Sequence, residues 1–194
     1  MKSKHNITGI ILAGGKSSRM GTDKGLMLLH GKTFIEHIIQ ALKPTVDEII
    51  IVANNDEYDR FGETRIDDLI QDSGPLAGLF SGLKRSKTDL NLVLSCDVPF
   101  ITTRVLRIVT DAASDDFEII QAVYKNESLP HIGLYRKKCM VKSKELLDQG
   151  EKRLRSLARH FKTKDLHIDE VYEKNIQNIN TLQELKSLLN EIEN

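Results

Sequence analysis

Short apolar runs alternate with amphipathic helical patterns along most of this chain. Four runs rich in Ile, Leu and Val are predicted to be buried parallel strands: Ile7–Leu12, Glu48–Val52, Leu90–Ser95 and Glu118–Val123. Such alternation predicts a three-layer α/β fold with a mostly parallel central sheet and helices on both faces. No linker-like stretch interrupts the 194 residues, so we expect a single domain over residues 1–194.

The predicted helices carry start signals. Two capping boxes, Thr33–Glu36 and Thr181–Glu184, each precede an apolar stripe with helical spacing. Pro75 stands where the first residue of another helix would lie. These signals place helices directly after predicted strands or loops, as a parallel sheet requires.

Polar segments follow three of the predicted strands. The Gly14–Lys24 loop, Asn54 and Asp97 each come after a strand. Ligands of parallel α/β sheets bind beyond the carboxyl ends of the strands. One edge of the sheet should therefore gather all three segments.

The glycine-containing stretch GIILAGGKSSRMGTDKG, Gly9 to Gly25, is typical of a phosphate-holding loop after a strand. The dinucleotide fingerprint GxGxxG is excluded because Gly14 and Gly15 are adjacent. The stretch GLMLLHGKT, which ends at Thr33, ends like a P-loop. It has five intervening residues where that motif has four, and most of them are bulky, whereas a loop that wraps a phosphate needs small residues. The P-loop interpretation is therefore disfavoured.

A third template fits this loop. LAGGKSSRMGTDKGL resembles the signature loop of nucleotidyltransferases with a Rossmann-like sheet, and within that group it is most similar to the molybdenum cofactor guanylyltransferases. Further segments follow in that family's order: IVANN (51–55), DDLIQDSGPLAGL (67–79), LSCDVPFI (94–101) and NINT (178–181). The resemblance implies a Rossmann-like nucleotidyltransferase fold. It also implies transfer of GMP from GTP to the phosphate of molybdopterin carrying molybdenum, with release of pyrophosphate.

This reaction needs charge neutralisation and alignment rather than a general base, because the attacking phosphate oxygen is already deprotonated near pH 7. Gly14 and Gly15 would let backbone N–H groups approach the phosphates. By the resemblance, Arg19 and Lys24 would carry positive charge to the β- and γ-phosphates. From spacing alone, Asp97 either caps a turn or binds Mg²⁺, and the resemblance favours Mg²⁺.

The resemblance also assigns the nucleoside pocket. Leu12 and Ala13 would line the nucleoside through their backbone, and Asn54 and Asp68 match other nucleotide-contacting positions. Asp67 is a rival for Asp68, because the family's spacing to the following Gly-Pro segment varies. For Asn54 and Asp68 the alternative is a turn residue that hydrogen-bonds its own backbone.

The second substrate should occupy the other half of the cleft. Asn178 and Asn180 resemble family positions near the pterin, although a simple Asn turn before the last helix is an alternative. Lys152, Arg155 and Arg159 would share one face of a helix. That face would either bind an anionic pterin phosphate or remain a solvated basic surface.

The histidines show no metal-ligand spacing. His131 follows Pro130, and we expect both in an edge strand, where a proline is tolerated. We assign no role to His131 from the sequence.

Composition limits the partners. Lys+Arg and Asp+Glu both number 28, so bulk charge does not favour nucleic acid or an anionic membrane. No apolar run reaches the roughly 20 residues of a membrane span. Two cysteines do not make a disulfide framework, which favours a reducing, cytoplasmic compartment. We expect a monomer or weak oligomer in transient contact with other proteins of cofactor biosynthesis.

Three alternatives remain open at this stage. A molybdenum cofactor cytidylyltransferase differs mainly in its base pocket. A transferase of the same fold acting on a sugar or polyol phosphate commonly carries additional domains or insertions. A nucleotide-binding regulator could keep the glycines but would not need Arg19, Lys24 and Asp97 together.

Overall fold

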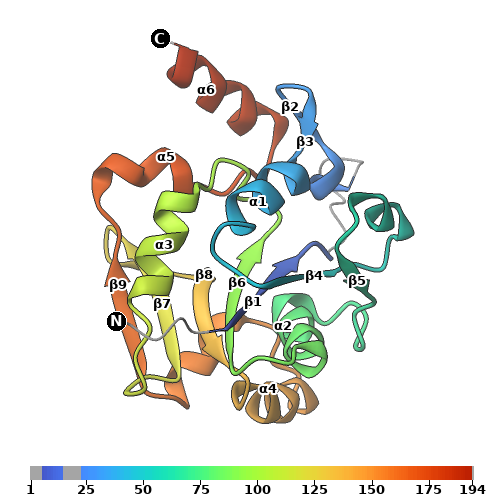
Figure 1. Ribbon diagram of the computed structural model, residues 1–194, viewed down its shortest axis with the longest axis vertical. Helices are drawn as coiled ribbons and strands as arrows, with labels where there is room; N and C mark the ends of the chain where they lie inside the picture. The colour runs from blue at the N-terminus through green and yellow to red at the C-terminus, as the bar shows by residue number, and fades with distance from the viewer. Residues whose placement is uncertain (1–5, 15–22, 194) are drawn as a thin grey trace.

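The computed structural model describes residues 6–14 and 23–193, and within them one mixed sheet forms the middle of the molecule (Figure 1). The strand order is β5-β4-β1-β6-β8-β7-β9, and β8 runs antiparallel to both of its neighbours. The strands are β1 (Ile7–Leu12), β4 (Glu48–Val52), β5 (Thr64–Ile66), β6 (Leu90–Ser95), β7 (Ile119–Tyr124), β8 (Glu127–Arg136) and β9 (Thr163–His167). The predicted bounds of β1, β4 and β6 are confirmed, and those of β7 are shifted by one residue.

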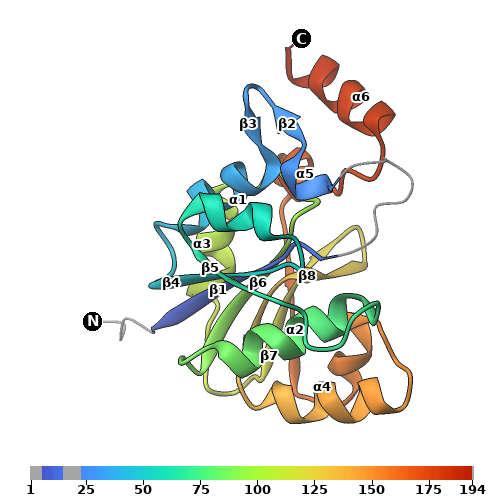
Figure 2. The same ribbon diagram turned by 90° about the vertical axis from the view of Figure 1, so that its right-hand side faces the viewer.

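Helices cover both faces of the sheet, which confirms the predicted three-layer α/β class (Figure 2). On one face lie α1 (Phe34–Leu42) and α3 (Thr103–Asp111). On the other lie α2 (Gly74–Arg85), α4 (Cys139–Asp148) and the 3₁₀ helix η3 (Leu154–Arg159).

Shorter elements lie around the carboxyl edge of the sheet. They are η1 (Lys24–Leu26), the hairpin of β2 (Leu28–Leu29) and β3 (Lys32–Thr33), η2 (Asp56–Phe61), η4 (Glu170–Tyr172) and α5 (Glu173–Ile176). The last helix, α6 (Leu182–Glu193), lies beside the β2–β3 hairpin (Figure 1). Its buried Leu185 and Leu188 join Leu29 and Phe34 in a small apolar cluster of their own.

The predicted capping boxes form at α1 and, with a shift, at α6. Thr33 donates its backbone N–H to Glu36 Oε2 at 2.6 Å. Glu184 donates its N–H to Thr181 Oγ1 at 3.1 Å, but its carboxylate accepts from Asn180 N at 2.6 Å, one residue earlier than in the usual box. The second box therefore also fixes the end of the segment that precedes α6.

The prediction that Pro130 and His131 lie in an edge strand is wrong, because β8 is paired on both sides by β6 and β7. The register between β7 and β8 jumps from Gln121↔Gly133 to Ala122↔Leu129. The residues of β8 within this jump form a bulge. Because a bulge leaves residues unpaired, it accommodates a proline inside the sheet.

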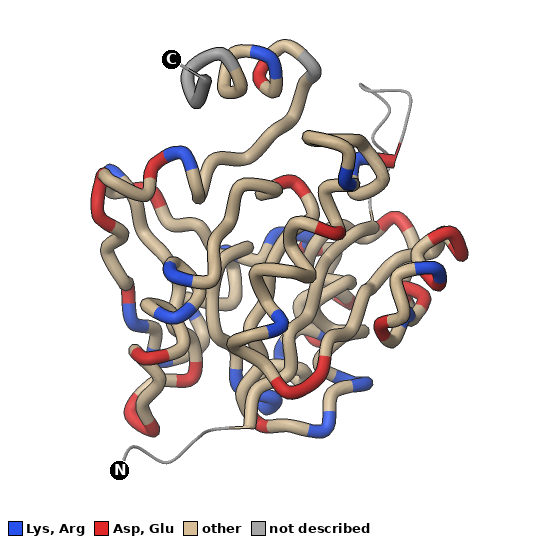
Figure 3. The backbone as a smooth tube through the Cα atoms, turned by 45° about the horizontal axis from the view of Figure 1, so that its top comes forward, with Lys and Arg blue, Asp and Glu red and all other residues tan. Residues whose placement is uncertain are grey.

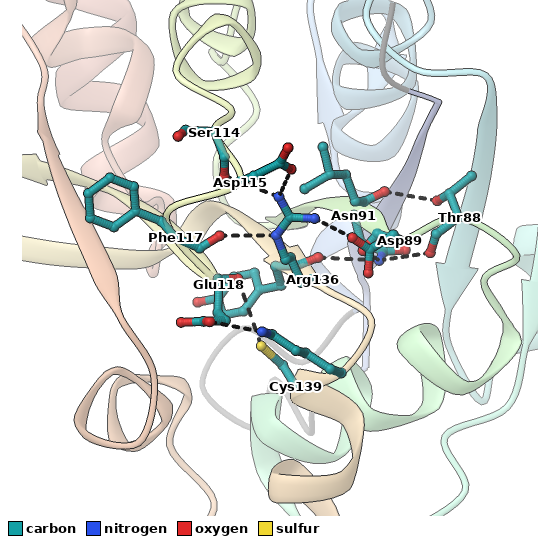
Figure 4. Close-up of polar contacts among 12 residues, drawn as sticks. Thr88, Asp89, Asn91, Ser114, Asp115, Phe117, Glu118, Arg136 and Cys139 are labelled. Atoms are coloured by element: carbon teal, nitrogen blue, oxygen red, sulfur yellow. Dashed lines mark hydrogen bonds and ion pairs between the residues drawn. The ribbon is translucent and has the colours of Figure 1, made fainter.

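Arg136 lies at the end of β8, on the side of the sheet opposite to the carboxyl ends of β1, β4 and β6. Its guanidinium group joins three segments (Figure 4). Its Nε donates to Phe117 O at 3.1 Å, and Nη2 donates to Ser114 O at 3.1 Å and to Asp115 at 2.7 Å. Its Nη1 pairs with the Asp89 carboxylate. The side chain is only 15% exposed, so it fixes the end of β8 against the segments that lead into β6 and β7.

Basic and acidic residues are interspersed along the backbone and do not separate onto two faces (Figure 3). This distribution agrees with the equal numbers of basic and acidic residues in the sequence. Within the part of the chain that the structure describes, no helix combines the length and apolar character of a membrane span.

Replacing Arg136 by methionine should lower the free energy of unfolding by about 1–3 kcal/mol, because the Phe117 and Ser114 carbonyls lose their donor in a half-buried place. Urea unfolding followed by circular dichroism measures this loss. Asp115→Asn is the matched control and should change stability by less than about 0.5 kcal/mol, since Asp115 is 94% exposed. Equal effects of the two variants would show that the carbonyl contacts contribute nothing.

Candidate active site

The carboxyl ends of β1, β4 and β6 meet at one edge of the sheet. The ladder continues past the strands, because Ala13 N donates to Val52 O and Cys96 N donates to Leu12 O, each at 3.0 Å. The segments that leave these strands therefore begin side by side. The structure thus brings Ala13, Gly14, Asn54 and Asp97 to one edge, whereas Gly15 and Arg19 lie outside the described residues.

A cleft of about 650 Å³ opens on the β5–β4–β1 side of this edge. It is bounded by the start of the glycine loop, the ends of β4 and β5, and the segment that leads into α2. Its lining residues are Ala13, Gly14, Asp23, Asn54, Asn55, Asp68, Gln71, Asp72, Ser73 and Gly74. Its volume falls within the range of small-molecule sites.

Asn54 and Asp68 both line this cleft and are hydrogen-bonded to each other. Asp68 N donates to Asn54 Oδ1 at 2.8 Å, and Asp68 Oδ1 accepts from Ile70 N at 3.2 Å and from Ser81 Oγ at 3.0 Å. Burial raises the pKa of the Asp68 carboxyl above its usual range. Because two donors hold Oδ1, the orientation of the carboxylate is fixed.

Asp67, the rival of Asp68, lies elsewhere. Its carboxylate pairs with Arg65 Nη1 at 2.6 Å, and its side chain is 70% exposed. It does not belong to the cleft lining. Of the two rivals, Asp68 therefore lines the cleft and Asp67 does not.

Asp23 connects the end of the glycine loop to the segment after β4, which the sequence did not indicate. Its Oδ1 accepts from Gly25 N at 3.1 Å and from the Tyr58 hydroxyl at 2.5 Å, and its Oδ2 accepts from Asn55 Nδ2 at 3.2 Å. Tyr58 is fully buried, and this burial raises the pKa of its phenol. Tyr58 therefore remains a neutral donor toward Asp23.

Lys24 lies beside the segment that precedes α6. Its Nζ donates to Asn180 Oδ1 at 2.9 Å. Ile179 N in turn donates to Asp97 O at 2.8 Å. These two contacts bring Lys24, the end of β6 at Asp97 and the NINT segment together, although more than 150 residues separate Lys24 from Asn180 in the sequence.

Three buried polar atoms near this place find no hydrogen-bond partner among the described residues: Asp97 Oδ1, His131 Nε2 and Asn178 Oδ1. Burial lowers the pKa of His131, whereas the neighbouring Asp97 charge and Asn178 oppose that shift. His131 lies at the carboxyl edge, because the next residue, Ile132, pairs with Leu94 near the end of β6. Sequence analysis gave no signal for this position.

The unpartnered Asp97 oxygen suits a divalent cation. Magnesium often takes one or two protein carboxylates and fills its other positions with phosphate oxygens and water. No group of three or more His, Cys, Asp or Glu among the described residues could hold a metal by itself. The residues present therefore fit a cation that arrives with a phosphate-bearing substrate.

The expectation that Lys152, Arg155 and Arg159 share a helical face is wrong. The helix η3 begins at Leu154 and is a 3₁₀ helix, so Lys152 precedes it and the α-helical spacing does not apply. Lys152 Nζ donates to Asp72 O at 2.9 Å. This contact places Lys152 at the cleft between β5 and α2.

Comparison with known proteins places these features in a family. The model of the MobA-like NTP transferase domain matches residues 9–166. The chain is 37% identical over 182 residues to a protein of Flavobacterium johnsoniae named "Probable molybdenum cofactor guanylyltransferase", covering 94% of this chain and 96% of that protein. It is 34% identical over 180 residues to the "Molybdenum cofactor guanylyltransferase" of Vibrio parahaemolyticus, covering 91% of each chain.

A solved structure shares the fold. The molybdopterin-guanine dinucleotide biosynthesis protein A of Archaeoglobus fulgidus superposes with a TM-score of 0.81 over 96% of this chain and 98% of that chain. The two sequences are 19% identical, so this likeness concerns the fold alone.

Gly25→Ala should destabilise the protein by about 1–3 kcal/mol, because its Cβ would lie 2.1 Å from the buried Tyr58 hydroxyl oxygen. In a Tyr58→Phe background the same substitution should cost less, since the nearest ring carbons are 3.0 and 3.1 Å away. Urea unfolding of both single variants and the double variant measures this coupling. Strictly additive effects would contradict the contact.

Proposed function

This chain belongs to the family with the MobA-like NTP transferase domain, and we propose that it transfers GMP from GTP to the phosphate of molybdopterin carrying molybdenum. The products are molybdopterin guanine dinucleotide and pyrophosphate. The curated relatives that bear the guanylyltransferase name support this assignment over nearly the full length of both chains.

The observation that carries the proposal is the contact between Lys24 Nζ and Asn180 Oδ1. It joins the end of the phosphate loop to the segment expected at the pterin. Asp97 lies against the same segment through Ile179 N. A nucleotide in the cleft lined by Ala13 and Asp68 would therefore have its phosphates directed toward the place where an acceptor phosphate arrives.

The protein groups act by positioning and by charge. The acceptor phosphate is already an anion near neutral pH, so no general base is required. Lys24 would offset the negative charge that builds up on the leaving pyrophosphate, and we assign the same role to Arg19. Backbone N–H groups of Gly14 and Gly15 would hold the phosphates in line with the attacking oxygen.

We assign Asp97 as the protein ligand of Mg²⁺. The support is its buried Oδ1, which finds no partner among the described residues. When bound, Mg²⁺ supplies charge neutralisation for the phosphates. Ile179 N and the end of β6 keep the Asp97 backbone fixed, so its carboxylate is available for the cation without a large rearrangement.

Asp68 is the acceptor that we assign to the base. Guanine presents N1–H and a 2-amino group as donors, and a fixed carboxylate in a partly buried cleft accepts both kinds of donor well. The backbone of Leu12 and Ala13 would line the nucleoside. Asn54 positions Asp68 through the Asp68 N–H. Asn178 and Asn180 we assign to the pterin side.

Incubating the protein with Mg²⁺, molybdenum-loaded molybdopterin and either labelled GTP or labelled CTP tests the proposed reaction. GTP should yield the dinucleotide and one pyrophosphate for each product, and CTP should yield little. Product from CTP alone would make the protein a cytidylyltransferase. Absence of product with both nucleotides would reject the proposed function.

Asp97→Asn should reduce turnover by at least about 100-fold, the scale of losing one charge-stabilising group. GTP affinity without Mg²⁺ should stay close to that of the unaltered protein, whereas the gain in affinity on adding Mg²⁺ should disappear. Titration calorimetry and a pyrophosphate assay measure the two effects. Asp111→Asn, an exposed residue at the end of α3, is the control. Full turnover by Asp97→Asn would reject the metal assignment.

A further inference from the structure

The wall of the cleft before α2 has an unusual backbone. Asp72 has a φ of 55° and Gly74 a φ of 71°, so left-handed residues occur at two of three neighbouring positions. For a residue other than glycine this conformation costs free energy and persists only where surrounding contacts hold it. Gln71, Asp72, Ser73 and Gly74 all line the cleft, so whatever holds this segment also shapes the cleft.

Lys152 contacts the segment on both sides of Gly74. Its Nζ donates to Asp72 O at 2.9 Å, and its backbone carbonyl accepts from Leu76 N at 3.1 Å. The second bond satisfies an N–H in the first turn of α2, where a helix lacks internal partners. A Cβ on Gly74 would lie 3.0 Å from Lys152 O, so the two backbones are in direct contact.

The Glu151 carboxylate fixes the backbone at Lys152. Its Oε1 accepts from Lys152 N at 2.9 Å and from Arg153 N at 3.0 Å, and its carboxylate also pairs with the Arg153 side chain. These bonds lower the pKa of Glu151 to about 2, with the Arg153 side chain the largest cause. Glu151 N donates to Leu146 O at 2.9 Å, which ties this turn to the end of α4.

We infer that Lys152 is a positioning residue for the nucleotide, which holds the Gln71–Gly74 wall of the cleft in its binding conformation. Its ammonium is engaged by a backbone carbonyl of the cleft wall, so it acts through that wall. The inference rests on the proposed function, because it takes the cleft to be the nucleotide site. It differs from both sequence-based expectations for Lys152, which were a contact with the pterin phosphate and a solvated basic surface.

Lys152→Met tests this inference, because it removes the donor and keeps most of the apolar stem. Its Kd for GTP, measured by titration calorimetry without acceptor, should rise about 5–10-fold, the scale of one ordinary hydrogen bond. The KM for GTP should rise in parallel, while kcat and the KM for the acceptor stay unchanged. Lys152→Arg, which restores a donor, should recover most of the affinity.

Lys144→Met is the matched control, because Lys144 pairs with Asp148 on the surface of α4. It should leave Kd, KM and Tm unchanged. A Lys152→Met variant that binds GTP like the unaltered protein, or that raises only the KM for the acceptor, would overturn the inference.

Hydrogen exchange separates this inference from the proposed function. In Lys152→Met the amides of Gln71–Gly74 should exchange faster than in the unaltered protein, and this measurement needs no substrate. If the unaltered protein binds no GTP, the proposed function and the nucleotide role of Lys152 both fail, whereas faster exchange would still show that Lys152 holds the wall. Unchanged exchange in Lys152→Met would overturn the inference even if GTP binds.

Discussion

The backbone hydrogen bonds on both flanks of β1 determine where the segments with Ala13, Asn54 and Asp97 leave the sheet. β1 pairs in parallel with β4 along one side and with β6 along the other. Because the pairing is parallel, all three strands leave the sheet in the same direction. The hydrogen bonds donated by Ala13 N and Cys96 N extend this pairing beyond the ends of the strands. The buried apolar side chains of these strands hold that register, because a shift by one residue would turn each side chain to the other face.

Much of this arrangement could be predicted from the sequence, since it depends on local patterns. Buried parallel strands are nearly continuous apolar runs, and the bounds of β1, β4 and β6 follow from them. The edge that gathers Ala13, Asn54 and Asp97 follows from strand direction alone. The resemblance favoured Asp68 over Asp67, but the sequence could not show that Arg65 engages Asp67 while Asp68 lines the cleft.

The sequence-based predictions that were wrong or missing concern contacts between residues that are distant in the sequence. The paired position of β8 rests on a bulge, and a proline such as Pro130 is compatible both with an edge strand and with a bulge. The link between Asp23 and Tyr58 joins residues 35 apart, and the sequence around Tyr58 does not indicate where its hydroxyl lies. Lys152 was grouped with Arg155 and Arg159 on one helical face by α-helical spacing. That spacing does not apply, because η3 is a 3₁₀ helix that begins at Leu154. Such contacts depend on packing, which a single sequence does not display.

Several carboxylates line the cleft, and hydrogen-bond donors hold them in fixed orientations. Asp23, Asp68 and Asp72 all line the cleft, and their charges would repel a triphosphate. The Asp23 carboxylate is engaged by donors from Gly25, Tyr58 and Asn55, and the Asp68 carboxylate by Ser81 and Ile70 N. Each carboxylate is thus fixed before a ligand arrives, so binding requires less ordering of the protein. Lys152 gives the Asp72 segment the same kind of fixation, because its Nζ donates to the Asp72 carbonyl.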